Sequence, residues 1–185
     1  MTNISVRFAP SPTGRLHVGN GRVALVNWLF ARSNKGKFIL RHDDTDIDRS
    51  GEKYIKEIEE SLTWLGTKWD SCFRQSERHQ LYEEAVNRLK STSYLYPCYE
   101  TPEELSLKRK AQLSVGKPPV YDRSALTLTN EEREKLENEG HRPHWRFRLD
   151  SSRSIWSDLI HGEMSLDPAT MSDPVLIRED GSPLY

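Results

Sequence analysis

The sequence predicts an α/β fold that contains a parallel β-sheet, and the order of its first elements is the main reason. Residues 4–9 alternate in side-chain character and stop at Pro10, which indicates a short strand that ends in a loop. An apolar helix is expected over residues 23–31, followed after a turn at Gly36 by an apolar strand over residues 37–41 (KFILR). Strand, helix and strand in this order form a βαβ unit with parallel strands. Because nearly all of the helix is apolar, we expect it to be buried on most sides.

Two further helices are expected before residue 95. The first covers residues 52–65 and ends at Gly66, and its apolar residues recur at helical spacing, at Ile55, Ile58, Leu62 and Leu65. The second begins near Ser76, with one stripe formed by Leu81, Ala85 and Leu89.

The character of the sequence changes after Tyr94, and we place a domain boundary near residue 95. The segment 101–104 (TPEE) has the pattern of a helix capping box with proline at the first helical position. Residues 144–148 (HWRFR) alternate between polar and aromatic side chains, which is typical of a strand with one solvated face.

Composition excludes several classes of protein. The formal net charge of −1 gives no overall basic field that would attract a polyanion. Two cysteines, Cys72 and Cys98, are too few for a disulfide-stapled fold and suit a reducing compartment. Neither a membrane-spanning apolar run nor a secretory signal pattern is present. We therefore expect a cytoplasmic protein without a membrane partner.

The turn between the first strand and the first helix has the composition of a phosphate site. Prolines stiffen it, while Gly14 and Gly19 allow a ligand or backbone to come close. The N-terminus of the following helix offers unpaired N–H groups and a positive dipole end, and His17 stands beside it as a hydrogen-bond donor. The alternative is a tight turn that is merely capped by a histidine.

The stretch RFAPSPTGRLHVG from Arg7 resembles the form of the HIGH signature found in glutamyl-tRNA synthetases, which are class I aminoacyl-tRNA synthetases. The segments NWLFARSNKGKFILR, DDTDIDRS, ESLTWLG, RQSERHQLYEEA, TPEEL and VLIREDGSPLY resemble the same family in the same order. The resemblance implies a Rossmann-like nucleotide-binding fold with an inserted α+β domain that binds the tRNA acceptor stem. Residues 1–94 would form the first half of the catalytic domain, 95–175 the inserted domain, and 176–185 the return to the catalytic domain.

The implied reaction is the ATP-dependent ligation of L-glutamate to tRNA(Glu). It proceeds through glutamyl-adenylate and releases diphosphate and AMP, with Mg²⁺ on the phosphates. The family's second, lysine-rich signature loop and its anticodon-binding part are not in the sequence. We therefore expect an N-terminal piece that is inactive alone, belonging to an enzyme that is monomeric at full length. Strands that pair with the KFILR strand and its neighbours are expected beyond Tyr185.

The resemblance also assigns individual residues. His17 and Asn20 take the catalytic positions, although Asn20 replaces the second histidine of the signature and cannot carry charge. ATP would contact Pro10, Thr13, Gly14, His17, Gly19 and Asn20. Glutamate would contact Arg7, Ala9, Ser11, Asp43 and Tyr185. Arg7 suits a carboxylate because its guanidinium fork is bidentate.

Two positions depart from the family or allow a plain structural role. Asp43 stands where the family commonly has a glutamate for the substrate ammonium group, and its side chain is one methylene shorter. Asp44, Thr45 and Asp46 are expected mainly to cap and brace their loop.

The second part of the chain raises the questions of zinc and tRNA. Some relatives bind zinc through a Cys-x-Cys pair, but this chain has Cys98-Tyr99-Glu100 there, so we expect no metal site and no zinc. Arg142, Arg146 and Arg148 are candidates for contacts with acceptor-stem phosphates, and an ordinary strand with a charged face is equally compatible with their positions.

Two other functions remain open from the sequence. One is a glutamyl-queuosine tRNA(Asp) synthetase, although those enzymes usually carry the zinc cysteines. The other is a non-catalytic RNA-binding module derived from the same fold, which would be expected to lose His17 or Arg7.

Overall fold

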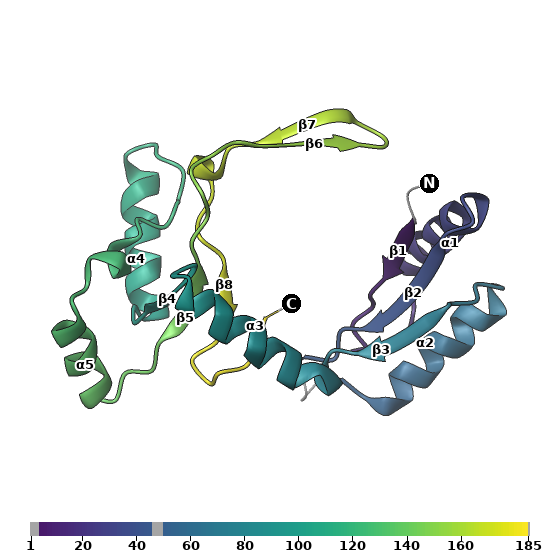
Figure 1. The fold of residues 1–185 in the computed structure, drawn as a ribbon, viewed down its shortest axis with the longest axis horizontal. Coiled ribbons are helices and arrows are strands. Elements are labelled where there is room, and N and C mark those ends of the chain that lie inside the picture. Colours follow the sequence, from purple (N-terminus) through teal and green to yellow (C-terminus); the bar gives the residue numbers. More distant parts are fainter. Residues whose placement is uncertain (1–3, 46–49, 185) are drawn as a thin grey trace. The chain divides into compact units, whose positions relative to one another are not determined.

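The computed structural model describes residues 4–45 and 50–184 (Figure 1). The chain forms two compact units, of which the first reaches Tyr82 and the second runs from Glu83 to Leu184. The division lies inside helix α3 (His79–Ser91), earlier than the boundary near residue 95 that the sequence predicts.

A three-stranded parallel sheet with strand order β1-β2-β3 organises the first unit. Its strands are β1 (Ser5–Phe8), β2 (Lys37–His42) and β3 (Ser71–Arg74). Helix α1 (Val18–Ser33) connects β1 to β2, and helix α2 (Glu52–Trp64) connects β2 to β3. The predicted βαβ unit is confirmed, and α2 with β3 forms a second one.

Helices α1 and α2 share one buried core with the sheet. That core consists of Phe8, Ala24, Ala31, Phe38, Leu40, Ile58 and Leu62. Because successive strand residues point to opposite faces, Arg7, Ile39 and Arg41 lie on the other face of the sheet, away from both helices. The predicted end of α2 is also confirmed, since Gly66 closes it with a φ of 76°.

Two expectations about this unit are wrong. Helix α1 is not buried on most sides, because the sheet covers one face while Val23, Val26 and Leu29 on the other are each about half exposed. The second expectation was that the KFILR strand pairs with strands beyond Tyr185. It is the central strand β2, and it pairs with β1 on one side and with β3 on the other.

Asp70, directly before β3, forms hydrogen bonds with residues of β2 and α1. Its carboxylate accepts the backbone N–H of Phe38 at 2.7 Å and the guanidinium of Arg32 at 3.0 Å. The Phe38 hydrogen bond, followed by that from Arg32, holds the pKa of Asp70 below its ordinary value. The carboxylate thus links the end of α1 to the edge of the sheet.

The second unit combines a three-stranded sheet, a hairpin and two helices. Its sheet has the order β4-β5-β8, with antiparallel pairs between β4 (Leu95–Cys98), β5 (His144–Phe147) and β8 (Val175–Ile177). Strands β6 (Ser154–Asp158) and β7 (Gly162–Leu166) form a separate hairpin. Helices α4 (Pro102–Ser114) and α5 (Asn130–Asn138) both begin with a capping box. The 3-10 turns of this unit are η2 (Ser124–Thr127) and η3 (Pro168–Thr170), while η1 (Ser76–Arg78) precedes α3 in the first unit.

Asp173 is the polar centre of the second unit. It is fully buried and accepts the Tyr96 hydroxyl at 2.7 Å, the Arg123 guanidinium at 2.8 Å and the Leu149 N–H at 3.0 Å. Burial alone would raise the pKa of Asp173, but these three donors together hold it below the ordinary value. Asp173 lies just before β8, so these hydrogen bonds connect that segment to β4, to the residue before η2 and to the segment after β5.

Candidate active site

The loop between β1 and α1 is held in place by its prolines. Pro10 and Pro12 are both buried. The carbonyl oxygen of Pro10 accepts the N–H of Asp43 at 3.0 Å, and that of Pro12 accepts the N–H of Gly51 at 3.2 Å. The loop is therefore fixed against the end of β2 and the start of α2, so that little ordering remains for a ligand to impose.

His17 is the N-cap of α1, and its ring is exposed. Its Nδ1 accepts the backbone N–H of Gly19 at 3.1 Å. A ring nitrogen that accepts carries no hydrogen, so the neutral ring has its N–H at Nε2. The cap therefore fixes the tautomer and leaves Nε2 as a donor beside the positive end of α1.

Gly19 is required by the position of that ring. A Cβ at residue 19 would lie 2.9 Å from Cε1 and 3.0 Å from Nδ1 of His17. Gly14 differs, because a Cβ there would meet no atom within 4 Å. Its predicted role, to let a ligand come close, therefore depends on the ligand and not on packing within the chain.

A hollow of about 400 Å³ lies against this turn. It brings together seven of the residues that the sequence assigns to ATP or glutamate, namely Ala9, Pro10, Ser11, Thr13, Gly14, His17 and Asn20. Its volume falls in the range of roughly 300–1,000 Å³ typical of small-molecule sites. Arg7, Gly19 and Asp43 do not line it.

Arg7 is exposed on the sheet face that α1 and α2 leave free. Its neighbour across the sheet is Ile39, in register with it on β2. The structure describes no hydrogen bond or ion pair between Arg7 and another described residue. The guanidinium is thus available to a carboxylate ligand.

Asp43 is buried at the end of β2 and already has a cationic partner. Arg41 donates to its two carboxylate oxygens, with Nε at 2.5 Å and Nη2 at 2.8 Å. The bidentate pair fixes the direction of the carboxylate. A substrate ammonium group that binds Asp43 would therefore contact a carboxylate that is already paired with Arg41.

Of the two acidic residues expected to brace this loop, the structure describes Asp44 but not Asp46. Asp44 is buried and accepts the N–H of Ser76 at 2.9 Å and the Ser76 hydroxyl at 2.6 Å. The bracing role predicted for Asp44 is confirmed. Asp46 and the predicted glutamate contact Tyr185 lie outside the described residues.

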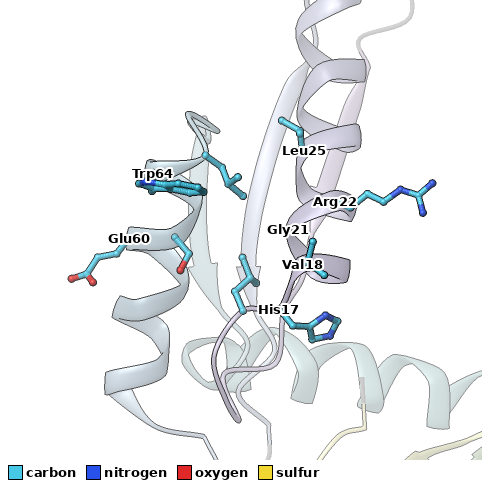
Figure 2. Close-up of a pocket in the computed structure, with 10 residues that line it drawn as sticks. His17, Val18, Gly21, Arg22, Leu25, Glu60 and Trp64 are labelled. Atoms are coloured by element: carbon cyan, nitrogen blue, oxygen red, sulfur yellow. The ribbon is translucent and has the colours of Figure 1, made fainter.

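A larger, mostly apolar groove of about 690 Å³ lies between α1 and α2. Figure 2 shows Trp64 on α2 and Leu25 on α1 at this groove, with the side chains of His17 and Arg22 extending away from α2. Trp64 is 85% exposed and Val18 is 91% exposed. The His17 ring thus stands at the rim of the groove and not inside it.

The three arginines predicted to contact tRNA have different surroundings. Arg142 is exposed, and Arg148 is partly exposed. Arg146 is buried, donates to the carbonyl oxygen of Asp173 at 2.8 Å, and lies 4.2 Å from the centre of the Tyr121 ring. Arg146 is thus the most buried of the three and packs within the second unit, and its contact with acceptor-stem phosphates stays a prediction.

The surroundings of Cys98 bear on the expectation that no zinc is bound there, which stays a prediction. Its thiol is buried, and burial raises its pKa to about 11. Oε1 of the nearby Glu100 accepts the Tyr121 hydroxyl at 2.7 Å and Lys108 at 3.3 Å, while its buried Oε2 has no hydrogen-bond partner among the described residues. Around the Cys98 thiol, Arg146 supplies a positive charge and Glu100 a negative one.

Comparison with known proteins relates this geometry to a family. The family described as tRNA synthetases class I (E and Q), catalytic domain, matches residues 3–185. The chain belongs to this family. Its α/β architecture, with parallel and antiparallel sheets, is that of a class I synthetase catalytic domain.

Relatives within this family are glutamate–tRNA ligases. One from Hyphomonas neptunium is 56% identical over 185 residues, which is 100% of this chain and 42% of the relative. One from Parvibaculum lavamentivorans is 59% identical over 180 residues, covering 97% of this chain and 40% of the relative. A solved glutamate tRNA ligase from Elizabethkingia meningosepticum, in complex with its amino acid, has a TM-score of 0.86 and 36% identity, covering 99% of this chain and 40% of that one.

The chain therefore spans about 40% of the length of the relatives it matches. None of these relatives is described as a queuosine enzyme or as a silent RNA-binding module, so the two alternative functions gain no support. Among the helices of the described segments, none is long and apolar enough to cross a membrane.

Proposed function

We propose that the enzyme to which these residues belong catalyses the ATP-dependent ligation of L-glutamate to tRNA(Glu). The reaction passes through glutamyl-adenylate and releases diphosphate and AMP. The observation that carries the proposal is the hollow at the β1–α1 turn, where His17 is held by Gly19 with its donor nitrogen free. Relatives that are 56% and 59% identical to this chain are glutamate–tRNA ligases.

His17 stabilises charge in this reaction and forms no covalent intermediate. The glutamate carboxylate attacks the α-phosphorus of ATP, and negative charge moves onto the phosphate oxygens. The Nε2–H of His17 donates to one of these oxygens, and the unpaired N–H groups of the first turn of α1 add their dipole. Asn20 lines the same hollow and offers an amide donor without charge.

The described residues do not provide a separate magnesium site in this hollow. Asp43 is paired with Arg41, and Asp44 is taken by Ser76. Mg²⁺ therefore enters with the substrate, bound to the phosphates of ATP. Pro10, Thr13, Gly14 and Gly19 shape the turn against which the nucleotide lies.

The amino acid is selected by charge. The guanidinium of Arg7 pairs with a substrate carboxylate, with Ala9 and Ser11 at the adjacent end of β1. Asp43, held by Arg41, receives the ammonium group. Tyr185 completes the pocket in this proposal.

The tRNA is bound by residues 95–175, which form an inserted α+β domain between residues 1–94 and 176–185. Support comes from the composition of the second unit, which contains its own sheet, helices and hairpin. Arg142 and Arg148 are the arginines with exposed surface for acceptor-stem phosphates. The enzyme acts as a monomer in the cytoplasm.

Charging of purified tRNA(Glu) with labelled glutamate by the full-length enzyme tests the proposal. We expect glutamyl-tRNA(Glu) from the wild type and a kcat that is lower by about 100-fold or more in His17→Ala, because a lost transition-state donor typically costs that much. His79→Ala is the matched control, since His79 is exposed at the start of α3 and does not line the hollow. Charging of tRNA(Asp) in place of tRNA(Glu) would support the queuosine enzyme instead.

A further inference from the structure

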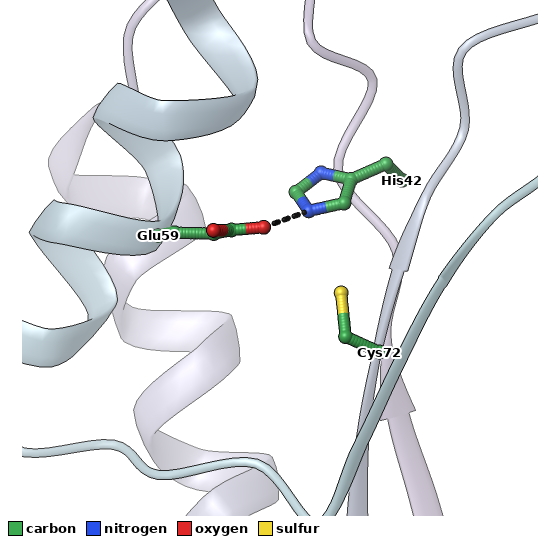
Figure 3. A group of neighbouring side chains, drawn as sticks. All are labelled: His42, Glu59 and Cys72. Atoms are coloured by element: carbon green, nitrogen blue, oxygen red, sulfur yellow. Dashed lines mark hydrogen bonds and ion pairs between the residues drawn. The ribbon is translucent and has the colours of Figure 1, made fainter.

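Three residues with metal-binding side chains meet inside the first unit, outside the proposed reaction site. His42 comes from the end of β2, Cys72 from β3 and Glu59 from α2 (Figure 3). One potential ligand atom from each residue lies within 4.8 Å of the other two. All three elements belong to the same compact unit and pack on one another.

The hydrogen bond between His42 and Glu59 explains only part of this arrangement. Nε2 of His42 lies 3.0 Å from Oε1 of Glu59, and the imidazole is fully buried. Its Nδ1 has no hydrogen-bond partner within the described segments. The Glu59 side chain is 37% exposed, and its only ion-pair partner in those segments is His42. The Cys72 thiol points to the same spot without a disulfide partner (Figure 3).

The ligand set is chemically consistent. An imidazole nitrogen, a thiolate and a carboxylate oxygen suit a borderline cation such as zinc, whereas Mg²⁺ and Ca²⁺ prefer oxygen alone. Zinc lies about 2.0–2.3 Å from such atoms, so its tetrahedral ligands are roughly 3.3–3.8 Å apart. Nε2 of His42 and Oε1 of Glu59 are 3.0 Å apart, and one ligand atom from each of the three residues lies within 4.8 Å of the others, so the separations are close to that range.

We propose that His42, Glu59 and Cys72 form a zinc-type site with a fourth position open to water. The thiolate and the Glu59 carboxylate together balance the two positive charges of the ion. Cys72 is exposed, which gives the ion a path from solvent, while the buried imidazole anchors it to the sheet.

A bound ion would join α2 to both β2 and β3. His42 directly precedes Asp43, so the ion would also stiffen the end of β2 where Asp43 and its partner Arg41 lie. The site differs from the one that Cys98 would have provided, because Cys98 lies in the other unit. Sequence reasoning missed it because the three residues lie apart in the chain and are brought together by the single β2–α2–β3 crossover.

Titration of the purified, metal-free protein with Co²⁺ and then with Zn²⁺ tests the proposal. We expect a thiolate-to-cobalt charge-transfer absorption that saturates at one ion per chain and is displaced by Zn²⁺. The Cys72→Ala variant should lose this absorption and bind Zn²⁺ more weakly, by at least the roughly 10- to 100-fold that an outer-shell loss costs. Cys98→Ala is the matched control and should keep the absorption, since Cys98 lies in the other unit.

A second measurement separates metal binding from a purely structural role of His42. Zinc should raise the midpoint of thermal unfolding in the wild type and not in Glu59→Gln, a surface substitution that preserves shape. The proposal is overturned if Co²⁺ gives no charge-transfer absorption, or if the absorption survives in Cys72→Ala.

Discussion

The backbone N–H of Gly19 donates to Nδ1 of His17 across 3.1 Å, and this one hydrogen bond fixes which nitrogen of the imidazole carries its hydrogen. While the ring keeps this position there is no room for a side chain at residue 19, because a Cβ would lie 2.9 Å from the ring. The pair thus explains why a glycine follows two residues after the histidine in the turn.

Gly19→Ala should therefore lower activity without lowering stability. The exposed ring can rotate away from the new methyl group, and alanine is favoured over glycine within a helix by roughly 0.5–1 kcal/mol. Displacing Nε2 should reduce kcat for adenylate formation by about 10- to 100-fold. Steady-state kinetics of the full-length enzyme, with urea unfolding in parallel, measure both effects.

Gly14→Ala is the matched control for stability, since a Cβ there meets nothing within 4 Å. Its unfolding midpoint should equal that of the wild type. If Gly19→Ala lowered the free energy of unfolding by as much as it raised the activation free energy calculated from kcat, the role given to the ring would be contradicted.

Arg7→Lys should raise the KM for glutamate by about tenfold or more and change the KM for ATP little. Lysine keeps the charge but loses the fork that pairs with a carboxylate, a difference on the order of one charge-assisted hydrogen bond. Steady-state kinetics with each substrate varied in turn provide the test. An equal rise in both KM values would remove Arg7 from the amino-acid pocket.

The Arg41–Asp43 pair should behave as one unit. Both side chains are mostly buried, at 17% and 9% exposed, so Asp43→Asn leaves a buried guanidinium unpaired and should destabilise the protein by about 3 kcal/mol. Asp43→Asn should also raise the glutamate KM more than Asp43→Glu, which keeps the charge. A double-mutant cycle with Arg41→Gln checks the coupling, and additive effects would show that the two residues act independently.

Asp70 should make the first unit sensitive to acid. Its folded-state pKa lies below the ordinary value, so its contribution to stability is present above the unfolded-state pKa and is lost as the pH falls through the folded-state pKa. The stability difference between wild type and Asp70→Asn should therefore be largest near neutral pH and shrink toward about pH 3. Asp150→Asn, at an exposed position, serves as control in urea unfolding across this range, and a difference independent of pH would contradict the assignment.

Local patterns predicted the elements whose signals lie within a few residues. The spacing of Ile55, Ile58 and Leu62 located α2 and its buried face, and the TPEE pattern located the start of α4. The β1–α1 turn could be assigned because its prolines, glycines and histidine are contiguous. In each case the information is local and the physics is that of a cap, a turn or one helix face.

Features that depend on tertiary pairing were missed. Strand β3 is short and polar, and it is recognisable mainly through its register with β2. The burial of Arg146 depends on Asp173 and Tyr121, which are distant in sequence. The partnership of Arg41 with Asp43 could have been found, because residues two apart at the end of a strand lie on the same face.

Diphosphate exchange with ATP by the full-length enzyme, in the presence of tRNA, tests the central claim most directly. The account predicts exchange that depends on glutamate, is not supported by glutamine, and falls about 100-fold in His17→Ala. Exchange supported by glutamine, or exchange with glutamate that is undiminished in His17→Ala, would contradict it.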